Sequence, residues 1–293
     1  MKQRKRPVRR VGIIGAGRVG SALAWHCRRL GYRIVGITDK KPKQAWVVYG
    51  LLKEPYRRWR PSVLAMASDI LFITVPDRAI EPVFSAIRRY LRRGTIVVHC
   101  SGVLGIDAFR DASEQGVEVL ALHPVQSFPS HAEAIRTLTG CFFALEGSRK
   151  GLALGRNLVR RLKGSWVEVT GPDRPLYHTM CVFASNFESV LMDAAEAIAA
   201  RLGISPHRAG RMLAPLMRSV LENAVEYGTL ASLTGPVQRG DTRTVARHLE
   251  ALSTRVPELV PLYRACSLRL VDMAKRQGLD AAAVAELRSL LRD

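Results

Sequence analysis

Apolar runs alternate with stretches of helical periodicity over the first 170 residues of the chain. The runs cover residues 8–14, 33–38, 69–75, 95–99, 117–122, 141–145 and 165–169. Short apolar runs bounded by turn residues are typical of buried parallel strands, and the helical stretches between them supply the crossover connections. The alternation predicts an α/β fold with a doubly wound, mainly parallel sheet.

Two places in this half are less regular. Residues 42–66 are apolar but interrupted by Pro55 and Pro61, which predicts a helix followed by a weak strand. The turn Ser101-Gly102 is predicted to open another helix.

After Gly171-Pro172 the periodicity becomes helical throughout. Helices are predicted over residues 173–202, 205–228, 242–253, 256–278 and 280–292, with Gly and Pro at the breaks between them. The change of pattern predicts three parts: a basic tail (1–6), an α/β domain (7–170) and an all-helical domain (171–293). Asp241 is expected to be the N-cap of the helix that follows it.

A glycine pattern marks the first strand-to-helix turn. Gly15-Ala16-Gly17-Arg18-Val19-Gly20 follows an apolar strand and opens a helix within a strand-helix-strand unit. In that setting Gly15 permits the tight turn, Gly17 lets the backbone approach a pyrophosphate, and Gly20 lets helix and strand pack closely. The helix N-terminus favours phosphate groups, so the pattern predicts a Rossmann domain that binds NAD or NADP.

The residues after the second strand bear on the choice of cofactor. Asp39 stands where an acidic residue holds the ribose hydroxyls of NAD. If the strand ends at Thr38 instead, the Thr38 hydroxyl, Lys40 and Lys41 would meet the 2′-phosphate of NADP. The sequence favours NADP slightly and leaves NAD open.

Charge and cysteine content bear on the possible partners of the protein and on its cellular compartment. The net charge is +20, but the basic residues are spread through all segments without an aromatic-rich binding motif, which argues against a nucleic-acid partner. Five scattered cysteines form no Cys-x-x-Cys pair, which argues against a zinc site and for a reducing cytoplasm. No apolar stretch is long enough for a membrane span.

Candidate chemistry gathers where the predicted strands end, because ligands of open parallel sheets bind at the carboxyl ends of the strands. Val75-Pro76 is expected to form a wall beside the cofactor, and Ser101 to offer a hydroxyl near the nicotinamide. His123 is the candidate proton donor, with a strand-end residue bonded to backbone as the alternative. For His99 the structural role is preferred.

The chain resembles a bacterial family that joins a Rossmann-like domain to a C-terminal domain of unknown function. The family lies within the 6-phosphogluconate dehydrogenase-like superfamily, with hydroxyacid dehydrogenases, ketopantoate reductases and prephenate dehydrogenases. The segments that carry the resemblance are Val75-Pro76-Asp77, His99-Cys100-Ser101-Gly102, His123-Pro124-Val125-Gln126-Ser127-Phe128, Ser185-Asn186, and Leu233-Thr234-Gly235-Pro236-Val237-Gln238-Arg239-Gly240-Asp241. The resemblance implies the fold and the cofactor class, and a serine and a histidine that serve catalysis in prephenate dehydrogenases.

The predicted helix after Pro175 would supply the other wall of the site. His178 and Ser185 are seven residues apart and would share a helix face. In related hydroxyacid dehydrogenases a lysine four residues before the matching asparagine acts as general acid, but here that position is Val182. His123 or His178 would then replace the lysine, while Asn186 could bind a substrate oxygen.

Three classes of function follow. The first is an NAD(P)-dependent oxidoreductase acting on a small carbonyl compound, best a 2-oxo acid of ketopantoate type, with prephenate-like oxidation or imine reduction as alternatives. Arg239 could clamp a substrate carboxylate. The second is a non-catalytic NAD(P) sensor, and the third, nucleic-acid binding, rests on charge alone. The helices after residue 171 carry more apolar residues than a monomeric domain of this size needs for its core, which predicts a homodimer through the helical domain.

Overall fold

The computed structural model describes residues 8–292, and the predicted basic tail (1–6) lies outside them. The chain divides into two compact units, Met1–Ser185 and Asn186–Asp293. The junction predicted at Gly171 falls before this division, because the helix α7 (Arg174–Phe183) packs with the first unit. The two units are described separately below.

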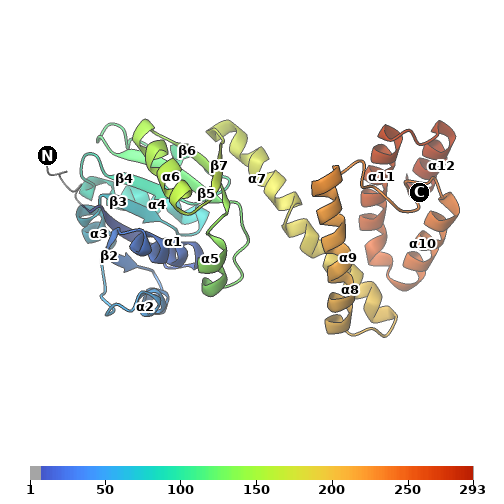
Figure 1. The fold of residues 1–293 in the computed structure, drawn as a ribbon, viewed down its shortest axis with the longest axis horizontal. Helices are drawn as coiled ribbons and strands as arrows, with labels where there is room; N and C mark the ends of the chain where they lie inside the picture. Colours follow the sequence, from blue (N-terminus) through green and yellow to red (C-terminus); the bar gives the residue numbers. More distant parts are fainter. Residues whose placement is uncertain (1–7, 293) are drawn as a thin grey trace. The chain divides into compact units, whose positions relative to one another are not determined.

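The first unit is built on a seven-stranded sheet (Figure 1). The strand order is β2-β1-β3-β4-β5-β6-β7, and only β6 runs antiparallel to its neighbour β5 among the described pairs. The strands are β1 (Arg10–Ile14), β2 (Arg33–Thr38), β3 (Ile70–Ile73), β4 (Ile96–His99), β5 (Glu118–Pro124), β6 (Phe142–Gly147) and β7 (Ser165–Glu168). The predicted α/β class and mainly parallel sheet are confirmed.

Helices cover both faces of this sheet because its central strands are apolar on both sides. Residues of β3 and β4 are fully buried. One core joins the sheet to α1 (Arg18–Arg29), α2 (Pro42–Leu51), α5 (His131–Thr137) and α6 (Arg149–Arg161). The opposite face packs against α3 (Pro61–Ala67) and α4 (Asp77–Ile87). Burial on both faces fixes the sheet, and with it the common edge where the parallel strands end.

The second unit is helical. It contains α8 (Asn186–Arg201), α9 (Pro206–Tyr227), α10 (Thr242–Arg255), α11 (Val260–Arg276) and α12 (Ala281–Arg292). A core that includes Val245, Val271 and Leu287 joins α10, α11 and α12. Asp241 caps α10 by accepting a hydrogen bond of 3.0 Å from the Thr244 backbone N–H, as predicted. Over residues 8–292, no helix combines the length and apolar character needed to span a bilayer.

Three local predictions were wrong, and one helix was missed. The helix expected over 173–202 breaks into α7 and α8 at Ala184-Ser185, where the Ser185 backbone N–H and hydroxyl bond back to the preceding turn. Residues 42–66 form two helices and no strand. The turn at Ser101-Gly102 leads only to a short 3₁₀ helix, η2 (Ile106–Phe109). The helix α5 was not predicted at all; Ser130 caps it through the Glu133 backbone N–H.

Candidate active site

The glycine-rich loop has the geometry that a pyrophosphate requires. Gly15 takes a φ of +104°, and a Cβ there would lie 2.5 Å from the Thr74 carbonyl. At Gly20 a Cβ would lie 2.1 Å from the Gly15 oxygen, so only glycine lets α1 approach β1 this closely. At Gly17, by contrast, no described atom lies within 4 Å of the Cβ position. The first-turn N–H groups of residues 18–20 border this open space and favour an anion there.

Asp39 stabilises the same loop through a hydrogen bond. Its Oδ2 accepts a hydrogen bond of 2.8 Å from the Ala16 backbone N–H, and its Oδ1 accepts one of 2.7 Å from the Lys41 backbone N–H. The Thr38 hydroxyl donates to the Trp59 carbonyl at 2.8 Å. Both side chains are therefore hydrogen-bonded within the protein, and neither interpretation of the cofactor site from the sequence included these contacts.

A cavity of about 670 Å³ opens beside the loop, at the carboxyl ends of β1 and β2. Among its lining residues are three basic and two aromatic side chains, Lys40, Arg58, Arg60, Tyr56 and Trp59. Asp39 is the only carboxylate among the described lining residues. Three cations against one carboxylate favour a phosphorylated ligand. Sequence reasoning found Lys40 but missed the rest; the basic and aromatic run at 56–60 was the signal that could have revealed them.

The turn after β3 closes this cavity on the sheet side. Val75 lines the cavity, and the backbone at 74–75 lies against Gly15. Pro76 is the residue before α4, and its carbonyl accepts the Ala79 backbone N–H at 2.8 Å. The Val75-Pro76 turn thus lies beside the glycine loop.

His99 and Ser101 stabilise the turn after β4. His99 is completely buried; its Nδ1 accepts from the Ser101 backbone N–H at 3.2 Å, so its Nε2 donates to the Gly105 carbonyl at 3.0 Å. Burial lowers the pKa of His99 to about 4. The Ser101 hydroxyl accepts from the backbone N–H groups of Val103 and Leu104. Both side chains hold the turn, which is the role preferred for His99.

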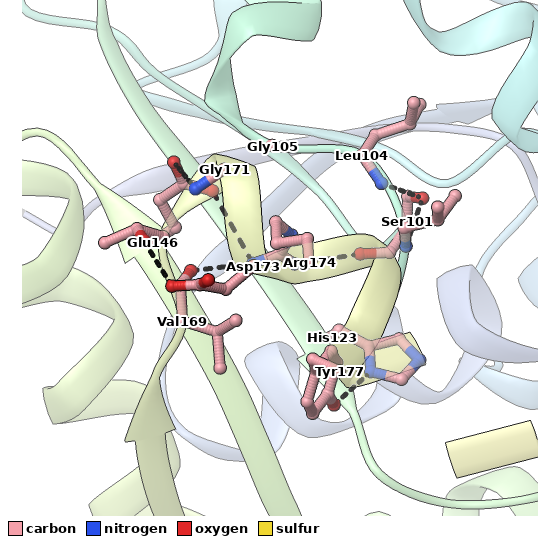
Figure 2. A network of polar contacts seen from close by, with 12 residues as sticks. Ser101, Leu104, Gly105, His123, Glu146, Val169, Gly171, Asp173, Arg174 and Tyr177 are labelled. Carbon is pink, nitrogen blue, oxygen red and sulfur yellow. Dashed lines mark hydrogen bonds and ion pairs between the residues drawn. The ribbon is translucent and has the colours of Figure 1, made fainter. Parts of the chain in front are cut away.

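His123, at the end of β5, pairs with a tyrosine that sequence reasoning missed. Its Nδ1 lies 2.7 Å from the hydroxyl of Tyr177 on α7 (Figure 2). Burial, and then the charge of Arg174, lowers the pKa of His123 to about 4, while burial raises the pKa of Tyr177. The phenol therefore stays protonated and donates a hydrogen bond to Nδ1. The neutral imidazole then carries its own hydrogen on Nε2. The sequence had suggested a histidine that titrates near neutral pH; burial moves its pKa well below that.

Gly102 brings the second histidine into the same place. A Cβ at Gly102 would lie 2.9 Å from His123 Nε2 and 2.6 Å from His178 Cδ2. The two imidazole centroids are 6.2 Å apart, at an angle of 76°. The Ser101-Gly102 turn, β5 and α7 thus place Ser101, His123 and His178 together, as the sequence had suggested.

A buried arginine ties this group to the sheet. Arg174 has no exposed surface, donates from Nη2 to the Ser101 carbonyl at 3.0 Å, and lies 3.7 Å from Glu146 Oε2 (Figure 2). Glu146 Oε1 accepts the Gly171 backbone N–H at 2.9 Å, and burial raises the pKa of this carboxyl group. Since a buried arginine needs a partner carboxylate, the pair fixes the start of α7 against the Ser101 turn. Neither residue was identified from the sequence, because no motif there marks Arg174 or Glu146 as one of a pair.

The remaining predicted residues lie elsewhere in the chain. The Ser185 hydroxyl donates to the Cys181 carbonyl at 2.6 Å and, because α7 ends at Phe183, does not share the His178 face. Asn186 begins α8, and Arg239 is exposed on the loop before Asp241; both belong to the helical unit. Their roles toward a substrate stay predictions.

Two family models match the chain in succession. A Rossmann-like domain covers residues 2–124, and a domain of unknown function, DUF2520, covers residues 141–270. This is the combination that the sequence resemblance implied. A curated relative, the glycerol-3-phosphate dehydrogenase (NAD(P)+) of Desulfitobacterium hafniense, is 27% identical over 138 residues. The match covers 43% of this chain and 39% of that enzyme, so the chain matches well under half of the relative's length.

Solved structures share the fold. One from Bacteroides fragilis, assigned as an NADP oxidoreductase, has a TM-score of 0.74 at 19% identity, over 89% of this chain and 96% of that one. The 1-pyrroline-5-carboxylate reductase of Streptococcus pyogenes has a TM-score of 0.60 at 14% identity, over 97% of both chains. The fold of this chain is therefore one that NAD(P)-dependent oxidoreductases use.

Proposed function

We propose that this chain, which matches a Rossmann-like model over residues 2–124 and DUF2520 over residues 141–270, is an NADPH-dependent reductase of small carbonyl compounds. Its substrate class is a 2-oxo acid of ketopantoate type. One observation carries the proposal: the glycine loop with its open approach and the His123–Tyr177 pair both lie where strands of one parallel sheet end. The cofactor and the hydrogen-bond donor to the substrate carbonyl would then meet at one edge of the sheet.

The cofactor assignment rests on the cavity beside the glycine loop. Lys40, Arg58 and Arg60 line it, and the one nearby carboxylate, Asp39, is occupied by the Ala16 backbone N–H. A 2′-phosphate gains charge-assisted hydrogen bonds from these three cations, whereas the ribose hydroxyls of NAD would meet only the remaining lone pairs of one carboxylate. The residues therefore fit NADP better than NAD.

The residues of the second cluster fit proton handling. A bound reduced nicotinamide supplies the hydride. His123 carries its hydrogen at Nε2, the atom of this ring nearest to the Cβ position at Gly102, and would donate a hydrogen bond from it to a carbonyl oxygen that gains negative charge, while water supplies the proton that the oxygen takes up. Tyr177 positions the ring by occupying Nδ1, and Ser101 holds the turn. His178 packs beside His123 and would border the substrate.

In the helical unit we assign Asn186 and Arg239 to the substrate carboxylate and oxygens, by amide and guanidinium hydrogen bonds. The Ser185 hydroxyl, which donates to the Cys181 carbonyl, would bind a substrate as an acceptor. Prephenate-like oxidation uses the same serine and histidine positions and belongs in the same substrate screen.

Imine reduction is a second candidate. A histidine with a pKa of about 4 carries no dissociable imidazolium proton at neutral pH, whereas a protonated imine brings its own proton and needs none from the enzyme. The fold likeness to 1-pyrroline-5-carboxylate reductase agrees with this chemistry.

The test is calorimetric titration with NADPH, NADH and their oxidised forms. We expect NADPH to bind more tightly than NADH, and Arg58→Gln with Arg60→Gln to weaken NADPH by about tenfold or more while NADH changes little. Arg149→Gln, an exposed charge on α6 outside the cavity, is the matched control. No binding of any form by the folded protein overturns the proposal.

Turnover is then followed by loss of nicotinamide absorbance with 2-oxo acids and with cyclic imines. His123→Asn should abolish the rate and leave the NADPH affinity within about twofold. Tight binding without turnover of either class assigns the chain instead to the non-catalytic sensors.

We further propose a homodimer through the helical unit. In α8 and α9, only Ala199 and Ala209 are buried. Large apolar side chains stand exposed on α9: Met212, Leu216, Val220, Leu221 and Val225. Rows of this kind mark a protein interface, and a second copy offers the same face in return. Light scattering should give twice the chain mass, and Leu216→Glu with Val220→Glu should give monomers; a wild-type monomer at micromolar concentration refutes the dimer.

A further inference from the structure

A second cavity, of about 650 Å³, lies at the opposite edge of the sheet from the glycine loop. Arg10 and Arg33, the first residues of β1 and β2, line it, so it sits where these strands begin. Arg28 from the end of α1 and Arg57 from the segment after α2 complete a set of four arginines. Glu54 is the only carboxylate among the described lining residues.

Two of these arginines are already neutralised. Arg10 forms an ion pair of 3.0 Å with Asp69, and Arg28 pairs with Glu54. For Arg33 and Arg57, no described carboxylate lies within ion-pair distance of the guanidinium group. Arg33 and Arg57 thus each bring a solvent-exposed guanidinium group without a described carboxylate partner to this cavity. Such groups attract an anion.

An aromatic wall completes the cavity. Tyr32, Tyr49 and Trp59 line it alongside the arginines. Trp59 lies close over β2, where a Cβ at Gly36 would be 2.6 Å from its indole Nε1. Arginines beside flat aromatic rings are the combination that recognises a phosphate group on a small organic molecule.

The segment 54–60, called the strap here, separates this cavity from the cofactor cavity. Glu54 and Arg57 line the second cavity, whereas Arg58 and Arg60 line the first. Trp59 lines both, and its carbonyl is held by the Thr38 hydroxyl at 2.8 Å. Neighbouring arginines of one strap thus serve two different cavities.

We propose that the second cavity is a binding site for a phosphate-bearing small molecule, held by Arg33 and Arg57. The guanidinium groups bind the phosphate oxygens, and the ion pairs of Arg10 and Arg28 keep the rim in place. The site lies outside the proposed cofactor and substrate positions and does not depend on the proposed reaction.

Pyrophosphate is the probe, titrated calorimetrically into the full chain. Because the glycine loop and its cavity also suit pyrophosphate, two binding events are expected. Arg33→Gln and Arg57→Gln should each weaken one of them by about tenfold, which is about 1.4 kcal/mol, and the double variant should remove that event and leave the other. Both side chains are exposed, so circular dichroism should show folded variants. Arg58→Gln, on the same strap but lining the other cavity, is the comparison variant and should weaken only the other event.

A loss of pyrophosphate binding in Arg58→Gln, with none in the Arg33 and Arg57 variants, would place the anion in the cofactor cavity and overturn the proposal. So would no binding by the wild-type protein. Phenyl phosphate separates the sources: tighter binding than pyrophosphate assigns the site to a phosphate ester, and weaker binding assigns it to free diphosphate. NADPH titration of the double variant should be unchanged, so this test and that of the proposed function fail separately.

Discussion

Two buried neutral histidines should make the sheet unit lose stability in mild acid. The pKa values of His99 and His123 are held at about 4 by burial, with the Arg174 charge adding to the effect. In the unfolded chain each would have the ordinary value of 6.5. As the pH falls through that value, the unfolded chain takes up two protons that the folded protein does not take up until the pH is near 4. Stability is therefore complete above 6.5 and is lost between 6.5 and 4.

The magnitude follows from the width of this window. One pH unit below its unfolded pKa, each histidine costs about 1.4 kcal/mol, so the two together cost about 3 kcal/mol near pH 5.5. His26, whose pKa burial also lowers, adds to the loss. Glu146 acts in the opposite direction, because its pKa is raised and the folded protein takes up its proton first. Asp69, with a pKa of about 2, acts only in stronger acid.

Urea unfolding followed by tryptophan fluorescence measures this effect. Trp25, Trp46, Trp59 and Trp166 are the four tryptophans of the chain, and all lie in the sheet unit. His123→Asn keeps an acceptor near the Nδ1 position and removes one of the two protons. Its loss of stability between about pH 7.5 and 5.5 should be smaller than the wild-type loss by about 1.4 kcal/mol. Equal losses in both proteins, or a His123 proton resonance that titrates near 6.5, would refute the reasoning.

Three further predictions concern single contacts. Gly17→Val should weaken NADPH binding at least tenfold without loss of stability. Gly20→Ala should fail to fold stably, because its Cβ would lie 2.1 Å from the Gly15 oxygen. An unstable Gly17→Val protein together with a stable Gly20→Ala protein would contradict the loop geometry. Tyr177→Phe should cost about 1–3 kcal/mol and allow the proton of His123 to move to Nδ1 in long-range ¹H–¹⁵N spectra, where the wild type shows it on Nε2 alone. Arg174→Met should cost about 3–5 kcal/mol in urea unfolding, because it leaves its carboxylate partner buried and unpaired; a cost below about 1 kcal/mol would argue that the pair is dispensable.

Most helices and strands could be predicted from local sequence patterns. The apolar runs and the glycine spacing determined the strand-helix alternation and the nucleotide loop, because each acts through neighbours within one strand-helix unit. Gly15 and Gly20 could be interpreted from the sequence for this reason. The break between α7 and α8 was missed because helical periodicity continues across Ala184-Ser185.

The order of the strands follows only from tertiary packing, as does the antiparallel β6. The same holds for the chemistry of the candidate site. Asp39 turns to the Ala16 backbone N–H, a choice between two directions at the end of a strand that no local pattern encodes.

The sequence by itself determined that this chain has a dinucleotide-type loop on an α/β sheet and a helical C-terminal part. Only the tertiary structure decided that His123 is neutral and paired with Tyr177, and that Arg174 is buried beside the Ser101 turn. The physical reason is distance along the chain. These partners are separated by more than fifty residues, and their burial, which sets the pKa values, exists only after the sheet has brought them together.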